Sequence, residues 1–220
     1  NMYKAVDENR DQSYFLFNTT REQLNYLRFP LGGLLKDETR EIAKKLNLNV
    51  ADKPDSQDIC FVPNGDYTSV IQKFRPDSFQ KGNIKNLNGE VIGVHDGIIN
   101  FTVGQRRGLN IGGGDPLYVL RLEPNTQRVI VGPKESLLQE TIFLNKINWL
   151  GDEPLGDNVM DISVKIRSMT PLLPAKLRGS QDGSGEVVLD TPYAGIAPGQ
   201  ACVFYRDRRM LGGGWIARHN

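Results

Sequence analysis

The strongest constraint on the fold is a series of short segments after about residue 141 in which apolar and polar residues alternate. Alternation with a period of two is typical of strands that bury one face and expose the other. Short strands at regular spacing predict a small closed barrel or a sandwich. The segments that carry this pattern are residues 161–167, 175–178, 185–189 and 200–205.

The middle of the chain carries two hairpin patterns. Asn88 and Gly89, a pair favoured in tight hairpin turns, separate the segments 82–85 and 91–94. Most of the 23 glycines lie after residue 80, which also favours turn-rich β structure in the C-terminal two-thirds. The second hairpin pattern consists of the segments 117–122 and 128–131 around the turn 123–126.

The first third of the chain is expected to be helical. Thr20 and Gln23 have the spacing of a capping box, in which each side chain satisfies a backbone N–H of the other residue. A short helix is therefore predicted after Thr20, with Leu24 and Leu27 directed inward and its end before Phe29.

A second helix is predicted over 36–46 and is expected to stop at Asn47. Charged residues surround one apolar stripe, which is formed by Ile42, Ala43 and Leu46. The resulting fold class is α+β and mostly β. It has a helical segment over 1–64, a small β-rich domain over 65–141 and a C-terminal barrel over 142–220.

Charge excludes a polycation that coats nucleic acid, because 27 Lys and Arg residues face 26 Asp and Glu residues and the net charge is +1. Local surpluses of positive charge remain. Residues 101–134 hold five basic and two acidic residues, and residues 195–220 hold four and one, so each segment carries +3. Such surpluses suit contacts with phosphates, and they equally suit a solvated loop face.

Several other classes are excluded by what the sequence lacks. No apolar run approaches the roughly 20 residues of a membrane span, and two distant cysteines favour a reducing cytoplasm over a disulfide scaffold. No zinc-ligand spacing or Ser-His-Asp arrangement is present, so no metal site is expected. The glycine clusters 112–114 and 212–214 lack a phosphate-loop context and are expected in hairpins or bulges.

Cys60 is the candidate nucleophile of the chain. Its neighbours Ile59 and Phe61 are apolar, so spacing alone favours a buried core cysteine. Asp55 and Asp58 would raise the pKa of a thiol there, and an activated thiolate would need a nearby cation. Cys202 lies in an apolar run and is expected in the core.

Four motifs in register carry a family resemblance that runs from about residue 5 to residue 218. Together they resemble the bacterial and organellar tRNA-specific 2-thiouridylases. The motifs are residues 11–16 (DQSYFL), 55–62 (DSQDICFV), 102–109 (TVGQRRGL) and 197–200 (APGQ).

The resemblance implies an enzyme that replaces O2 of wobble uridine 34 with sulfur in the tRNAs for Lys, Glu and Gln. In this family ATP adenylates that oxygen, a cysteine persulfide delivers sulfur, and a second cysteine releases it by forming a disulfide. Cys60 matches the persulfide-bearing cysteine of the family. A terminal persulfide sulfur is a strong nucleophile, which suits this role. Sulfur-relay proteins downstream of a cysteine desulfurase would load it.

The resemblance also implies contacts with tRNA around the target base. A splayed anticodon base exposes C2, and an amide side chain such as that of Gln12 can read a uracil edge. The positions that match tRNA contacts in the family are Arg10, Asp11, Gln12, Arg167, Ser168 and Gln200.

The family also has an ATP-pyrophosphatase domain with a Ser-Gly-Gly-x-Asp-Ser loop. These 220 residues depart from the family in that they do not contain this loop. ATP, with Mg²⁺, is therefore expected to bind that domain. The chain is expected to be the inactive C-terminal part, with the tail of that domain in 1–64 and bare apolar surface there.

The alternatives are a non-catalytic tRNA-binding module with a structural cysteine, and a translation-factor-like barrel that binds a protein. The family barrel resembles domain 2 of elongation factor Tu, so the fold does not decide between them.

Overall fold

A computed structural model describes residues 1–53, 79–112, 114–180 and 182–218. These residues form two compact units, one made of Asn1–Lys53 with Gln139–Asn220 and the other of Pro54–Leu138. Cys60 and the predicted extended segment 58–62 lie outside the described residues. The three-domain division over 1–64, 65–141 and 142–220 stays a prediction.

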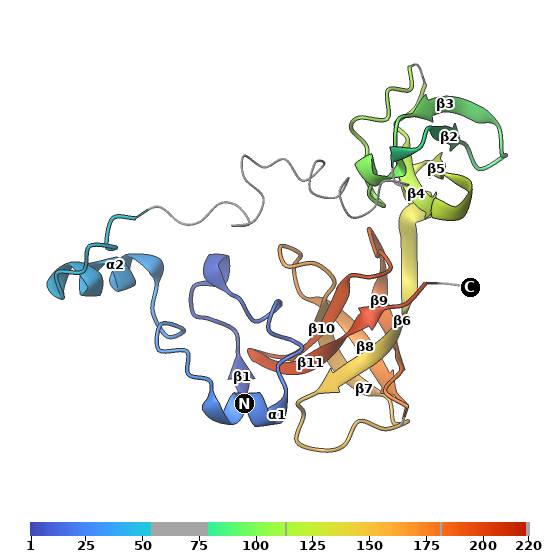
Figure 1. Cartoon of the computed structure of the whole chain (residues 1–220). Helices are drawn as coiled ribbons and strands as arrows, with labels where there is room; N and C mark the ends of the chain where they lie inside the picture. The colour runs from blue at the N-terminus through green and yellow to red at the C-terminus, as the bar shows by residue number, and fades with distance from the viewer. Residues whose placement is uncertain (54–78, 113, 181, 219–220) are drawn as a thin grey trace. The chain divides into compact units, whose positions relative to one another are not determined.

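The first unit is built on a closed six-stranded barrel, shown in Figure 1. Around the barrel the strands follow the order β11-β10-β7-β8-β9-β6, and β11 pairs with β6 to close it. The strands are β6 (Leu138–Trp149), β7 (Met160–Lys165), β8 (Leu173–Gly179), β9 (Gly185–Ala194), β10 (Ala201–Arg206) and β11 (Arg209–Ile216). The predictions of a mostly β chain and of a barrel are confirmed, whereas β6 and β11 were not predicted as strands.

The barrel interior is filled by the inward residues of the alternating strands, as the sequence pattern predicts. Leu177 on β8 is fully buried between exposed neighbours, and Val187 on β9 is fully buried between a partly exposed and an exposed one. Strand β10 departs from this alternation because five successive residues are buried. Cys202 and Phe204 face the barrel core, and the residues that alternate with them, Ala201, Val203 and Tyr205, belong to a second cluster with the N-terminal segment. A strand covered on both faces has a continuous apolar sequence.

Strand β11 contains the glycine cluster 212–214, which therefore forms no phosphate loop. Gly212 has φ +117°, and its Cβ would lie 2.0 Å from the carbonyl oxygen of Asn148 on β6. At Gly213 a Cβ would lie 2.8 Å from the ring of Phe17. The ladder is irregular next to these residues, so the expected bulge is confirmed. Glycine is needed here because β6 and Phe17 approach the β11 backbone closely.

The N-terminal segment packs on the outside of the barrel. It contains β1 (Met2–Tyr3), which pairs with β11, the 3-10 helix η1 (Glu8–Arg10), α1 (Arg21–Tyr26) and α2 (Lys36–Lys45). The ring of Phe17 lies edge-on to Trp215 with centroids 5.2 Å apart. These contacts place residues 1–53 in the same unit as the barrel.

The helices are shorter and more exposed than the sequence predicts. The capping box at Thr20 is present, and Asn47 has φ +53° just after α2, which confirms the predicted stop. Leu27 was expected to point inward but is 41% exposed, and Ile42 and Leu46 of the α2 stripe are 40% and 64% exposed. Periodicity identifies the apolar face of a helix without supplying the surface that would cover it. The first third is thus mainly turns, with few helical residues.

The second unit contains a four-stranded sheet in the order β3-β2-β5-β4. Both predicted hairpins are confirmed, and Gly89 has the positive φ of a tight turn. The strands are β2 (Gly82–Lys85), β3 (Val91–His95), β4 (Tyr118–Glu123) and β5 (Arg128–Gly132), with the 3-10 helices η4 (Ile98–Asn100), η5 (Pro124–Thr126) and η6 (Lys134–Leu137). Its core includes Ile84, Val119, Val129 and Val131, none of which is exposed.

Candidate functional site

All the candidate tRNA-contact residues lie on the first unit, in three short segments. These segments are the loop 10–14, the turn 167–170 after β7 and the turn 197–200 before β10. Cys60 lies outside the described residues, so the structure does not show its setting.

Asp11 shapes the loop 10–14. Its Oδ1 accepts hydrogen bonds from the backbone N–H groups of Ala5 and Ser13, each at 3.1 Å. Its Oδ2 accepts one from the Ser13 hydroxyl at 2.9 Å, and that hydroxyl lies 3.0 Å from the buried Tyr205 hydroxyl. The Asp11 carboxylate is therefore used by the fold, and it fixes the backbone next to the exposed residue Gln12.

Tyr14 connects this loop to both turns. Its hydroxyl lies 3.3 Å from the carbonyl oxygen of Ile166 and 3.1 Å from that of Ala201. Ile166 directly precedes Arg167, and Ala201 directly follows Gln200. One side chain thus brings together three segments that lie far apart in the sequence.

The turn after β7 orients Arg167. The Thr170 backbone N–H donates to the Arg167 carbonyl oxygen at 3.2 Å, and the Thr170 hydroxyl donates to the same oxygen at 2.8 Å. A guanidinium N–H of Arg167 donates to the carbonyl oxygen of Gly195 at 3.0 Å. Ser168 and the 87% exposed Met169 form the tip of the turn.

The turn before β10 follows from its own sequence. Pro198 and Gly199 are the residues that a type II turn favours at its two central positions, and Gly199 has φ +84°. The Gln200 N–H donates to the Ala197 carbonyl oxygen at 3.2 Å and closes the turn. Oε1 of Gln200 is buried with no hydrogen-bond partner among the described residues, so this acceptor is not used by the fold.

Electrostatics separate Cys202 from any sulfur chemistry. It is not exposed, and burial raises the pKa of its thiol far above the usual range. A protonated, enclosed thiol is a poor nucleophile, so Cys202 is a core residue as predicted. Burial also raises the pKa of Tyr14, with the nearby Cys202 adding to this effect and Arg167 opposing it. The Tyr14 hydroxyl therefore stays protonated and able to donate.

A cavity of about 640 Å³ lies beside the loop 10–14 in the first unit. Arg10, Asp11 and Gln12 line it together with residues that the sequence did not single out. These include the basic residues Lys4, Arg28 and Lys36 and the aromatic residues Tyr3 and Phe29. Cations and aromatic rings around one hollow suit an RNA backbone and an unstacked base.

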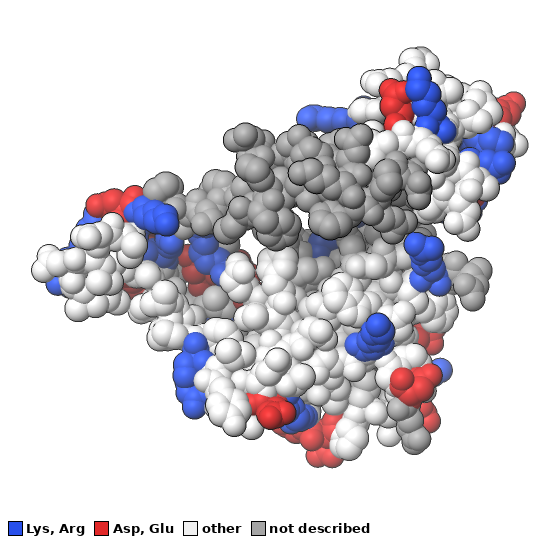
Figure 2. All heavy atoms as spheres, viewed as in Figure 1, with Lys and Arg blue, Asp and Glu red and all other residues white. Residues whose placement is uncertain are grey.

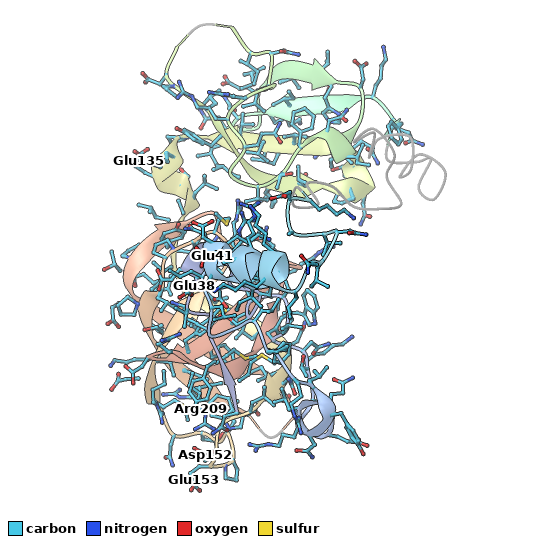
Figure 3. The ribbon with its side chains drawn as sticks, turned by 90° about the vertical axis from the view of Figure 1, so that its left-hand side faces the viewer. Glu38, Glu41, Glu135, Asp152, Glu153 and Arg209 are labelled. Atoms are coloured by element: carbon cyan, nitrogen blue, oxygen red, sulfur yellow. The ribbon has the colours of Figure 1, made fainter. Side chains whose placement is uncertain are left out.

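The basic surplus of the C-terminal segment is partly neutralised within the fold. Arg209 forms a two-pronged pair with Asp152 at 2.6 and 2.7 Å, and Figure 3 shows the two side chains together at one end of the barrel. This hydrogen-bonded pair lowers the pKa of Asp152. On the face shown in Figure 2, basic and acidic side chains are interspersed among large uncharged areas. On this face the described residues therefore show no single large basic patch.

Among the described residues the glycine clusters form no phosphate loop, and no cluster of metal ligands occurs. The cluster 212–214 lies in a strand, and Gly112 and Gly114 lie in a loop without a following helix. No group of three His, Cys, Asp or Glu side chains that could hold a metal occurs in this part of the chain. No helix among these residues is long and apolar enough to cross a membrane.

The sequence motifs gave Tyr14 no role of its own, although it lies inside the motif 11–16. No local pattern could have shown its role, because its partners are 152 and 187 residues away. Lys4 and Arg28 were also missed, since isolated basic residues carry no motif.

Comparison with family models defines the class of protein. Residues 1–64 match the tRNA methyl transferase HUP domain, residues 68–133 the tRNA methyl transferase PRC-barrel domain and residues 139–216 the aminomethyltransferase beta-barrel domain. These matches follow one another along nearly the whole chain, as in a multidomain tRNA-modifying enzyme.

The relatives identify the family within that class. The chain is 56% identical to the tRNA-specific 2-thiouridylase MnmA of Paracoccus denitrificans over 98% of its length, which covers 56% of that relative. It is 52% identical to that of Rhodospirillum centenum and 52% identical to that of Rickettsia massiliae, in each case over 99% of the chain and over 57% and 60% of the relative. The chain belongs to the tRNA-specific 2-thiouridylase family. It spans somewhat more than half the length of these relatives.

Proposed function

We propose that this chain is the tRNA-binding and sulfur-carrying part of a tRNA-uridine 2-sulfurtransferase. The reaction is the ATP-dependent 2-thiolation of wobble uridine 34 in the tRNAs for Lys, Glu and Gln. The observation that carries the proposal is the joining of the loop 10–14 to the turns 167–170 and 197–200 through Tyr14. The family match supports it, since the relatives named above are tRNA-specific 2-thiouridylases.

The proposed tRNA contacts divide by chemistry. Arg10 and Arg167 would bind backbone phosphates, while Gln12 would read the uracil edge with its amide. Ser168 and Gln200 would accept or donate hydrogen bonds to ribose or base. Asp11, whose oxygens accept from three protein donors, would act by holding Gln12 in position.

The proposed sulfur carrier is Cys60. Sulfur-relay proteins fed by a cysteine desulfurase would load it as a persulfide. Its terminal sulfur would attack C2 of a uridine that ATP has adenylated at O2, and AMP would leave with that oxygen. A second cysteine, which the chain does not supply because Cys202 is enclosed, would release the product by forming a disulfide with Cys60. ATP and Mg²⁺ would bind the ATP-pyrophosphatase domain. We place the protein in the cytoplasm and keep the likeness of its barrel to domain 2 of elongation factor Tu as a prediction.

Binding of an unmodified anticodon stem-loop by the full chain tests the recognition half. We expect the affinity to fall about tenfold in Gln12→Ala and in Arg167→Gln, and to stay unchanged in Arg178→Gln. Arg178 is a matched control because it is an exposed arginine on β8 of the same unit. Equal effects of Arg167→Gln and Arg178→Gln would contradict the proposed site.

Mass spectrometry tests the sulfur half and separates the proposal from a non-catalytic tRNA-binding module. The native chain is exposed to a cysteine desulfurase, its relay proteins and free cysteine, and added sulfur is mapped by peptide. We expect one additional sulfur atom on Cys60 and none on Cys202. A chain that binds tRNA but takes up no sulfur at Cys60, beside a working full-length relative, would be a binding module only.

A further inference from the structure

The loop 102–109 of the second unit presents two adjacent arginines for which the fold has no use. Arg106 and Arg107 are exposed, and their guanidinium groups have no ion pair or hydrogen bond with any described residue. Two other basic side chains of this unit are neutralised, since Arg121 pairs with Glu123 at 2.7 Å and Lys81 with Asp96 at 3.5 Å.

The loop is held in one shape by Gln105, which lies just before the arginine pair. Its Oε1 accepts from the Thr102 N–H at 2.9 Å, and its Nε2 donates to the Arg107 carbonyl oxygen at 2.9 Å. The backbone of Gln105 also accepts from the Val119 N–H of β4 at 2.9 Å. A side chain that bonds to both ends of a loop removes much of the entropy that binding would otherwise cost.

The ends of the loop are fixed as well. Phe101 and Leu109 are 8% and 7% exposed and belong to the core of the unit. Gly104 and Gly108 have φ +87° and +79°, which lets the chain reverse on either side of the arginines. The loop therefore holds its charged residues outward on an anchored frame.

We propose that this loop binds the phosphate backbone of the RNA substrate, as a contact separate from the candidate residues of the first unit. Guanidinium groups suit phosphate oxygens because they donate parallel hydrogen bonds and keep their charge at any physiological pH. An acidic protein is disfavoured because the apolar residues that end the loop are buried and Val103 within it is only partly exposed, so the loop offers no fully exposed aromatic or aliphatic anchor beside the arginines. The inference rests on the proposed function and adds the second unit to tRNA binding.

Salt dependence of tRNA binding by the full chain tests the inference. Each phosphate contact contributes about 0.7 to 0.9 to the slope of log K against log salt. We expect the double variant Arg106→Gln/Arg107→Gln to lower the magnitude of that slope by about 1.5, with affinity roughly tenfold weaker at 0.1 M salt. Arg106→Lys/Arg107→Lys should keep the slope, because it keeps the charges.

Arg121→Gln is the matched control, since it removes an arginine of the same unit that Glu123 already neutralises. An unchanged slope in the double glutamine variant, or an equal change in the control, would overturn the inference. If the double variant instead keeps its slope but no longer binds a sulfur-relay protein, the loop is a protein-binding site. Failure of the unmodified chain to bind tRNA at all would overturn the proposed function, a result distinct from these. An unchanged midpoint of thermal unfolding in the double variant would show that the unit is intact.

Discussion

Replacing Tyr14 by Phe removes one hydroxyl and leaves the packing of the ring. The hydroxyl has a single proton, which it donates to the carbonyl oxygen of Ala201 at 3.1 Å or of Ile166 at 3.3 Å. The ring keeps its edge-on contact with Phe15, with centroids 5.4 Å apart. A net hydrogen bond contributes about 1 kcal/mol, so we expect the free energy of unfolding to fall by about 1 kcal/mol.

The free energy of this hydrogen bond sets the largest change in RNA affinity that we expect for Tyr14→Phe. Without it the loop 10–14 is no longer tied to the two turns, and the fraction of molecules with all three segments in place falls. A change of about 1 kcal/mol corresponds to about a fivefold change in an equilibrium constant, so the Kd of Tyr14→Phe for an anticodon stem-loop should rise by up to about fivefold. Because burial raises the pKa of Tyr14, the effect should be constant between pH 6 and pH 9.

Fluorescence anisotropy with a labelled stem-loop gives the Kd, and urea unfolding gives the stability of the same preparations. Tyr26→Phe is the control, because Tyr26 is 81% exposed on α1 and has no role in the site. The reasoning is refuted if Tyr14→Phe loses about 1 kcal/mol of stability and binds RNA with unchanged affinity. That result would make Tyr14 a packing residue without influence on the site.

Three further predictions concern stability and reactivity. Burial lowers the pKa of His95. The stability of the second unit should therefore be complete above pH 6.5 and fall below it, where the unfolded chain takes up a proton that the folded chain resists. Amide exchange in β2 and β3 should show this loss in the parent chain and not in His95→Gln. Gly213→Ala should cost about 1 to 3 kcal/mol in urea unfolding, because the new methyl group meets the carbonyl oxygen of Cys202 and the ring of Phe17. Gly156→Ala, with nothing within 4 Å, should cost far less. Cys202 should resist thiol reagents in the native chain and react after denaturation, and rapid native labelling would contradict its enclosed position.

Local signals predicted most of the β structure. Asn88-Gly89 predicted a hairpin without help from the rest of the chain, and Gly89 supplies the positive φ in that turn. Strand β11 escaped prediction because its glycines have no side chains to alternate and are present for close approach to β6. Strand β6 escaped because buried and exposed residues alternate in only a short part of it.

The candidate site could be predicted only in part, for a related reason. Motifs pointed to Gln12, Arg167 and Gln200, but no pattern in the sequence indicated that Tyr14 joins them or that the Asp11 carboxylate is used internally. Both facts depend on tertiary contacts. Sequence motifs name the residues of a site, whereas the fold decides which of them reach a ligand and which hold others in place.

The position of the site follows from the two buried faces of β10. One face fills the barrel through Cys202 and Phe204, and the other meets the N-terminal segment through Val203 and Tyr205. The hydrogen bond between Ser13 and Tyr205 then fixes the loop 10–14 against the barrel wall. The candidate residues thus lie on a seam between a closed barrel and a segment packed on it. Because β10 supports both sides of this seam, we expect changes buried in β10 to weaken the proposed RNA binding without altering any of the candidate residues.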